Sequence, residues 1–122
     1  MKFRLLLFIL GQKMKKAAKS NNAFRNFIKG KNIRVAMKTA DGRQGKAFVI
    51  QEGHVRTSAM DQSPADAAFI WCDGDTAFSI MSSGDDEAFV AALTEKKLRP
   101  EGDFKEFLWF LTALGKMSVQ KR

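Results

Sequence analysis

Residue types that support catalysis and covalent cross-linking are scarce in this sequence. It contains no tyrosine, one histidine and one cysteine among 122 residues. The single cysteine, Cys72, excludes an internal disulfide framework and fits a reducing compartment. The single histidine, His54, excludes the usual histidine-rich metal sites, and no base stands beside Cys72 in the sequence to activate its thiol. We therefore expect no catalytic residues, no metal, no cofactor and no enzymatic activity.

Two short acidic clusters are the remaining candidates for ion binding. They occupy residues 73–75 and 85–87. Neither matches the twelve-residue calcium loop, and each directly precedes an apolar stretch with helical spacing. We interpret both clusters as helix caps, with Asp73 or Asp75 capping the first helix.

Acidic residues are absent from the first 34 positions, which hold ten of the 21 basic residues. The other 88 positions hold 11 basic and all 13 acidic residues, so the net charge of +8 belongs to the amino-terminal quarter. A slightly acidic body argues against a nucleic-acid-binding surface. The lysine cluster also lacks interleaved aromatic residues for base stacking. We expect no nucleic-acid partner.

No apolar run is long enough to span a membrane. The run Leu5–Leu10 falls short of the roughly 20 residues that a bilayer requires. It also lacks the small-residue cleavage site of a signal peptide. Residues 1–20 instead form a predicted amphipathic, basic helix. One of its faces is apolar: Phe3, Leu6, Leu7, Leu10, Met14, Ala17 and Ala18.

Two interpretations of this helix stand side by side. In the first, its apolar face packs on its own domain or on a dimer partner. In the second, its apolar end enters the acyl boundary of a membrane while its lysines contact anionic headgroups. The predicted docking residues are Lys13, Lys15, Lys16 and Lys19. The second interpretation places the protein in the cytoplasm, at the inner face of the membrane.

The rest of the chain changes its hydrophobic period several times. Alternation begins at Ile33, and we expect strands at residues 33–38, 46–51, 54–58, 67–72 and 98–101. Helical spacing predicts helices at residues 23–29 and 104–114, and two short ones ending near residues 83 and 96. Pro100 confines the last strand to an edge or an irregular position. Residues 21–116 then form one domain, followed by a basic tail at 117–122.

This order of elements resembles the sterol carrier protein 2 domain. The resemblance covers about residues 24–114 and rests on KTADG at 38–42, SPADA at 63–67, GDDEAF at 84–89, and Leu98 followed by GDF at 102–104. It implies an α+β fold: a five-stranded, mainly antiparallel sheet covered on one face by helices, with a lipid in an apolar tunnel between them. The amino-terminal helix is an addition to this pattern. The chain departs from it just before the last strand, where the family often has glycine and this chain has Lys96 or its neighbours, and at Pro100, where the family favours a β-branched residue.

The aromatic residues suggest where a ligand would lie. Six of the eleven phenylalanines and both tryptophans lie between residues 69 and 110, and phenylalanine carries no polar group that needs a partner. So many large apolar side chains either fill a core or enclose a cavity that accepts apolar guests. The predicted lining consists of Met37, Phe48, Ile50, Phe69, Trp71, Phe78, Met81, Phe89, Leu93, Phe107, Leu108 and Leu111.

Two functional hypotheses follow. The first is a non-catalytic lipid carrier that docks on an anionic membrane; the resemblance adds fatty acyl, sterol-like or isoprenoid ligands. The second is an interaction or dimerisation module with a filled core, accessory to an enzyme complex of a lipid pathway.

Overall fold

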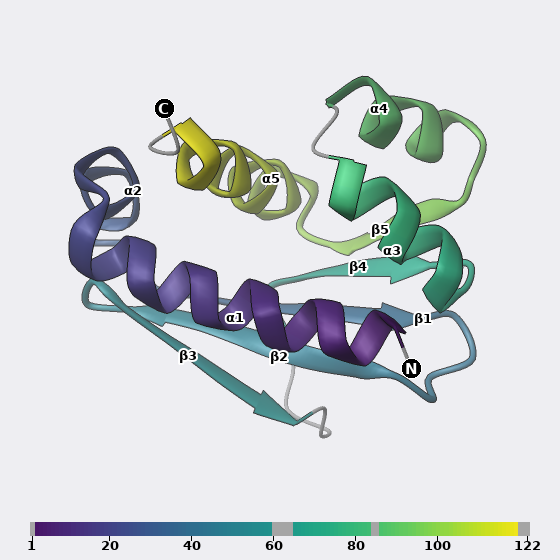
Figure 1. Cartoon of the computed structure of the whole chain (residues 1–122), viewed down its shortest axis with the longest axis horizontal. Helices are drawn as coiled ribbons and strands as arrows, with labels where there is room; N and C mark the ends of the chain where they lie inside the picture. Colours follow the sequence, from purple (N-terminus) through teal and green to yellow (C-terminus); the bar gives the residue numbers. More distant parts are fainter. Residues whose placement is uncertain (1, 60–64, 84–85, 120–122) are drawn as a thin grey trace.

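The computed structural model describes residues 2–59, 65–83 and 86–119. Within these ranges the chain forms five helices and five strands, arranged as Figure 1 shows. The elements are α1 (Lys2–Ser20), α2 (Asn22–Ile28), β1 (Ile33–Thr39), β2 (Gly45–Gln51), β3 (His54–Ala59), β4 (Ala67–Trp71), α3 (Gly74–Ser83), α4 (Asp86–Thr94), β5 (Leu98–Gly102) and α5 (Phe104–Val119). Every predicted element is present, with ends shifted by a few residues. The predicted tail begins inside α5, and residues 120–122 lie outside the described part.

The five strands form one sheet in the order β3-β2-β1-β4-β5. Three of the four neighbouring pairs are antiparallel, and β1 pairs with β4 in parallel. The predicted mainly antiparallel sheet is therefore confirmed, including the β1-β2-β3 meander. Strand β4, which follows β3 in the sequence, lies on the opposite side of β1 from β2. Pro100 lies on β5 at the edge of the sheet, where no neighbouring strand requires its missing N–H.

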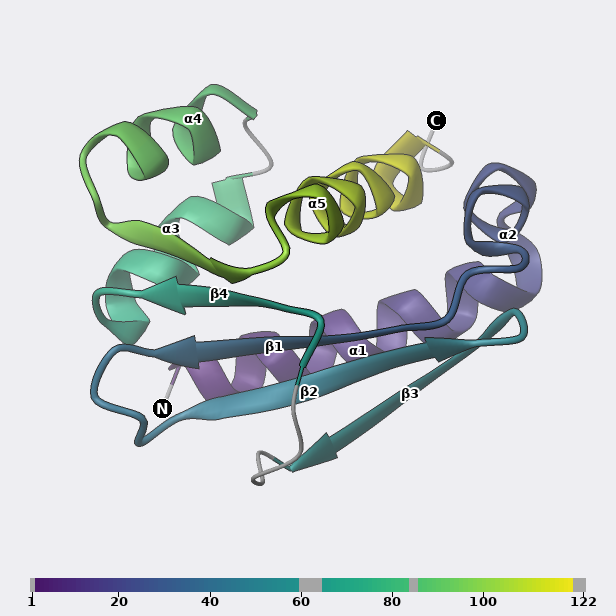
Figure 2. The same cartoon turned by 180° about the vertical axis from the view of Figure 1, so that it is seen from behind.

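The two faces of the sheet differ sharply. Val35, Met37, Phe48 and Phe69 point to the face that the helices cover, and each is fully buried. Helices α1, α3 and α5 lie over this face, and the view from behind shows the strands in front of α1 (Figure 2). On the open face Ala36, Ala68 and Ile70 form a separate small cluster with Ala65. The predicted one-sided helical cover is confirmed.

Helix α1 packs on its own sheet. Its inner face contributes Phe3, Leu7, Leu10 and Met14 to the core, each nearly or completely buried. Gly11 permits the close approach to β3, because a Cβ atom there would lie 2.9 Å from the Thr57 methyl carbon. Of the two interpretations of α1, packing on its own domain is thus confirmed for this inner face. The membrane interpretation concerns the opposite face.

Left-handed backbone marks the places where the chain reverses. Helix α4 ends at Thr94, and Lys96, two residues further on, has a φ of +63°. The Lys96 N–H donates to the Leu93 carbonyl (3.2 Å) and the Lys97 N–H to the Ala92 carbonyl (2.8 Å). This is the Schellman pattern, in which glycine normally holds the left-handed position. Lys96 therefore occupies the position where the sequence resemblance expects glycine.

Candidate functional site

The structure brings most of the predicted lining into one apolar interior. Ten of the twelve residues belong to the main core or pack against it. Met37, Phe48, Ile50, Phe69, Trp71 and Phe107 are completely buried, whereas Met81, Phe89, Leu93 and Leu111 are half-buried around them. Phe78 on α3 is half-buried outside this cluster. Leu108 lies on the outer side of α5, with 43% of its surface exposed.

The centre of this interior is an aromatic cluster between α5 and the sheet. Phe69 on β4 lies 4.2 Å from Phe107 and 5.7 Å from Phe110, measured between ring centroids. Phe48 on β2 lies 6.0 Å from Phe110. Phe110 was missing from the predicted lining, although its place in the apolar arc of α5 was the available signal. The α1 residues Phe3, Leu7 and Leu10 were missing as well, since a helical wheel shows an apolar face but not the surface it meets.

The cover over the end of β4 is thinner. Among the described side chains of α3 and α4, only Ala77 and Ala92 are fully buried. The large apolar residues Phe78, Ile80, Met81, Phe89 and Leu93 of these two helices are half-buried, and Val90 is 62% exposed. Trp71 lies beneath them with its ring 5.9 Å from the Phe89 ring, in an edge-on arrangement. This part of the interior is the easiest to open, because little apolar area holds its cover.

A polar pocket of about 220 Å³ lies at the same end of the molecule. It is lined by Phe3, Thr39, Asp41, Gln44, Asp73, Gly74 and Asp75. Within the residues that the structure describes, no three His, Cys, Asp or Glu side chains are grouped to hold a metal ion. The lining is too polar for this pocket to be the predicted lipid cavity.

Hydrogen bonds hold two of the three carboxylates of this pocket, those of Asp41 and Asp73. The Thr39 hydroxyl (2.6 Å) and the Arg43 N–H (3.0 Å) donate to Asp41 and hold the pKa of its carboxyl below the usual value. The Thr76 N–H donates to Asp73 over 2.7 Å and lowers the pKa of that carboxyl. Asp73 thus caps α3, as the sequence predicted.

The outer face of α1 carries an apolar end followed by a basic end. Leu5, Phe8 and Ile9 are 57%, 55% and 41% exposed. One to three turns further along the same side follow the exposed residues Gln12, Lys13, Lys16 and Lys19. We call these seven residues the outer stripe. Three of the four predicted docking lysines belong to it, and the fourth, Lys15, is half-buried.

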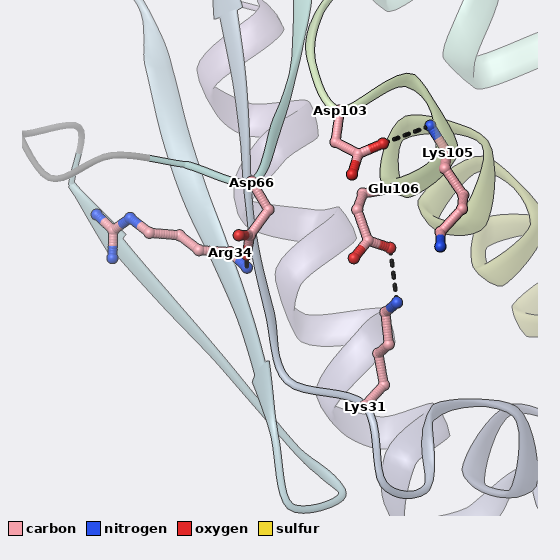
Figure 3. Close-up of polar contacts among 6 residues, drawn as sticks. All are labelled: Lys31, Arg34, Asp66, Asp103, Lys105 and Glu106. Atoms are coloured by element: carbon pink, nitrogen blue, oxygen red, sulfur yellow. Dashed lines mark hydrogen bonds and ion pairs between the residues drawn. The ribbon is translucent and has the colours of Figure 1, made fainter.

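Polar contacts fix the start of α5 against the strands and α2 (Figure 3). The Asp66 carboxylate accepts a hydrogen bond from the backbone N–H of Arg34 over 2.8 Å. The backbone carbonyl of Asp66 accepts one from the backbone N–H of Asp103 over 2.9 Å. The Lys31 ammonium lies 2.6 Å from the Glu106 carboxylate and 5.1 Å from the centre of the Trp109 ring. Trp109 in turn stacks on Phe27 of α2 at 5.1 Å. These contacts close the carboxy-terminal side of the interior.

No helix in the described ranges combines the length and the apolar character that crossing a bilayer requires. The sequence run Leu5–Leu10 belongs to α1, whose inner face is already occupied by the sheet.

Comparison with known proteins identifies the fold. No protein-family model and no curated protein matches the chain. Among solved structures it superposes on the ubiquinone synthesis protein UbiJ-SCP2 with a TM-score of 0.62 at 15% identity, over 90% of each chain. It superposes on sterol carrier protein 2 from Yarrowia lipolytica, in its apo form, with a TM-score of 0.56 at 12% identity over 89% of each chain.

A third neighbour is a conserved hypothetical protein of Thermus thermophilus, described as possibly a sterol carrier protein. Its TM-score is 0.54 at 14% identity, over 86% of this chain and 78% of that one. The chain therefore contains a sterol carrier protein 2-like domain, and the resemblance predicted from the sequence is confirmed. At these identities the likeness concerns the fold.

Proposed function

We propose that this chain is a non-catalytic lipid-binding protein that docks on an anionic membrane through the outer stripe of α1. Its ligand is a fatty acyl, sterol-like or isoprenoid chain held between the sheet and the helices. The fold supports binding of this kind, since one neighbour is described as sterol carrier protein 2 and another as possibly a sterol carrier protein. The observation that carries the docking part is the exposed apolar end of an otherwise packed helix.

The interior suits an apolar ligand for an energetic reason. Each methylene group moved from water into an apolar interior gains about 0.8 kcal/mol. Ten methylenes would exceed the lower estimates of the association cost without any polar contact. The half-buried Met81 and Leu93 line the thin side of the interior, and methionine adapts its shape to irregular guests.

The outer stripe suits an anionic lipid surface because its two ends complement the two layers of such a surface. Leu5, Phe8 and Ile9 would enter the boundary between headgroups and acyl chains. Lys13, Lys16 and Lys19 would then lie at the level of the headgroups, each contributing about 1 kcal/mol. Packing on the sheet does not require these residues, because the inner face of α1 makes those contacts.

Vesicle sedimentation tests the docking. Replacing Lys13, Lys15, Lys16 and Lys19 by Gln should abolish binding to vesicles of phosphatidylcholine and phosphatidylserine at low salt, with an unchanged circular dichroism spectrum. The matched control replaces four basic residues of the sheet side, Lys38, Arg43, Arg56 and Arg99, by Gln and removes the same charge. An equal loss of vesicle binding in both variants would show that binding depends on net charge alone, and it would contradict the proposed surface. Replacement of Leu5, Phe8 and Ile9 by Ser should also weaken binding while the lysines remain.

Organic extraction followed by mass spectrometry tests the ligand. Purified protein should release a lipid with a long apolar chain in an amount approaching one per molecule. Protein that carries no lipid, and that acquires none on incubation with vesicles, would contradict the binding proposal.

A second function is favoured by one observation. Six of the predicted lining residues are completely buried, and α1 adds Phe3, Leu7 and Leu10 to the same core, as expected for an interaction module with a filled interior. Such a module would serve an enzyme complex of a lipid pathway. A protein that binds no lipid but forms a concentration-dependent dimer in analytical ultracentrifugation would favour this alternative. One neighbour, UbiJ-SCP2, is itself described as a ubiquinone synthesis protein.

A further inference from the structure

Trp71 is the one large polar-tipped side chain at the thin side of the interior, among the residues that the structure describes. It ends β4, pairs across the sheet with Thr39 on β1 and Leu98 on β5, and points to the face that the helices cover. No part of its side chain reaches solvent. Its ring packs edge-on against Phe89 of α4.

The indole N–H of Trp71 has no hydrogen-bond partner within the described ranges. Buried polar groups in native proteins nearly always have one. Elsewhere the chain fills its core with phenylalanine, of which it has eleven. The second tryptophan, Trp109, is half-buried between Phe27 and Lys31. A phenylalanine at position 71 would provide a ring without a donor, so packing alone does not explain the indole.

The helices above Trp71 are the part of the cover most easily displaced. Helices α3 and α4 together bury Ala77 and Ala92 among their described side chains, whereas α5 buries Phe107, Phe110 and Ala113. Local opening requires less free energy where less apolar surface is held. An apolar chain that enters beneath α3 and α4 would meet Met81, Phe89 and Leu93 on one side and Trp71 on the other.

The charges at this end limit the kind of polar group that can accompany such a chain. Thr39, the cross-strand partner of Trp71, donates to the Asp41 carboxylate, and Asp73 follows two residues after Trp71. Both carboxyls have lowered pKa values and are therefore ionised at neutral pH. A further carboxylate brought to the buried indole would lose its hydration, and the nearby cations Arg43 and Lys97 already lie beside Asp41 and Asp73. An uncharged oxygen avoids this desolvation cost.

We infer that Trp71 donates its indole N–H to an uncharged acceptor oxygen of the bound lipid, in an ester, ketone or ether group. The lipid lies between β4 and the α3–α4 pair, with its hydrocarbon chain directed toward Phe69 and Phe107. This inference rests on the proposed lipid-binding function and specifies the ligand class: acyl esters and other neutral lipids rather than free fatty acids.

Nuclear magnetic resonance of ¹⁵N-labelled protein tests this contact directly. With two tryptophans, the spectrum contains two indole N–H signals, which Trp109→Phe assigns. Methyl palmitate should move the Trp71 signal downfield, as expected for a new hydrogen bond, and leave the Trp109 signal in place. Hexadecane has the same sixteen-carbon chain without oxygen and should shift the methyl signals of the interior without that downfield change. Palmitate should bind more weakly than its methyl ester.

The outcomes separate this inference from the proposed function. If methyl palmitate shifts the interior methyl signals but leaves the Trp71 N–H unchanged, the hydrogen bond is rejected and lipid binding stands. If none of the three probes perturbs an interior signal, lipid binding itself is rejected and the inference falls with it.

A variant provides a second measurement. Trp71→Phe should weaken methyl palmitate binding about fivefold, the value of one neutral hydrogen bond, and leave hexadecane binding unchanged. Equal weakening toward both probes would show that the indole contributes packing alone. The labelled wild-type protein answers the same question should this variant fail to fold.

Discussion

Two residues with left-handed backbone show how local geometry sets the frame of this fold. Lys96 terminates α4 and directs the chain into β5, and Gly102 terminates β5 and directs it into α5. Glycine adopts such a conformation without strain, whereas a residue with a Cβ atom pays for it. Lys96 therefore carries backbone strain that glycine would remove. A side chain at Gly102 would add both that strain and a clash with the Asp66 carbonyl oxygen.

Lys96→Gly should raise the free energy of unfolding by about 1 kcal/mol, because it removes the Cβ strain at a Schellman position. The matched control is Lys96→Ala, which removes the same charge but keeps the Cβ atom. Urea denaturation monitored by circular dichroism measures both. A glycine variant no more stable than the alanine variant would disprove the strain.

Gly102→Ala should lower the free energy of unfolding by about 3 kcal/mol. A Cβ atom there would lie 2.6 Å from the Asp66 carbonyl oxygen, in addition to the penalty of a φ near +79°. Gly42→Ala is the control, because Gly42 has a φ of +75° but no atom within 4 Å of the added carbon. Thermal unfolding should therefore separate the two variants clearly. Equal effects would mean that the close contact with β4 is relieved at little cost.

Because Asp73 caps α3, the free energy of unfolding should depend on the ionisation of its carboxyl. Hydrogen bonds from Thr76 lower the pKa of its carboxyl below the ordinary 3.8. The carboxylate therefore contributes stability that is complete above the unfolded-state pKa and is lost as the pH falls through the folded-state value. In Asp73→Asn the free energy of unfolding should decline less between about pH 5 and pH 2 than in the wild type. Denaturant titrations at several pH values measure this slope, and parallel slopes would contradict the assignment.

At the scale of elements, the helices divide into tightly and loosely held groups. Helix α5 is held by the aromatic cluster below it, by the stacking of Trp109 on Phe27 of α2, and by the contacts of Lys31 with Glu106 and Trp109. Helices α3 and α4 bury one alanine each among their described side chains. Entry of a ligand beneath α3 and α4 follows from this contrast, since the other helices would have to give up fully buried phenylalanines.

The ion pair between Lys31 and Glu106 should stabilise the α2–α5 contact by about 0.5–1 kcal/mol. A double-mutant cycle with Lys31→Met and Glu106→Gln measures this coupling, because methionine retains the stem over Trp109 and glutamine retains the shape. The control cycle uses Arg99 and Glu101, which lie 3.6 Å apart and are 63% and 53% exposed. Their coupling should be smaller and should disappear at high salt. Equal coupling energies in the two cycles would show that the Lys31–Glu106 pair contributes no more than an exposed ion pair.

At the scale of the whole molecule, local patterns predicted the elements well because they depend on hydrophobic period and capping. Alternation from Ile33 and the cap at Asp73 needed no knowledge of distant residues. The parallel pairing of β1 with β4 carries no local signal, since it depends on where the chain crosses after β3. The partner of the α1 inner face is equally a property of tertiary structure, as is the lack of an acceptor for the Trp71 indole among the described residues.

The attachment of α1 along its whole inner side has a consequence for orientation. A helix joined by a flexible linker would allow the domain any orientation at the membrane, but α1 is packed on the sheet and fixed to the domain. Adsorption through the outer stripe would lay the helix axis along the bilayer and turn the open side of the strands, with Arg56, toward the water. Lipid would then enter on the helix-covered side of the sheet, and a soluble enzyme would contact its open side.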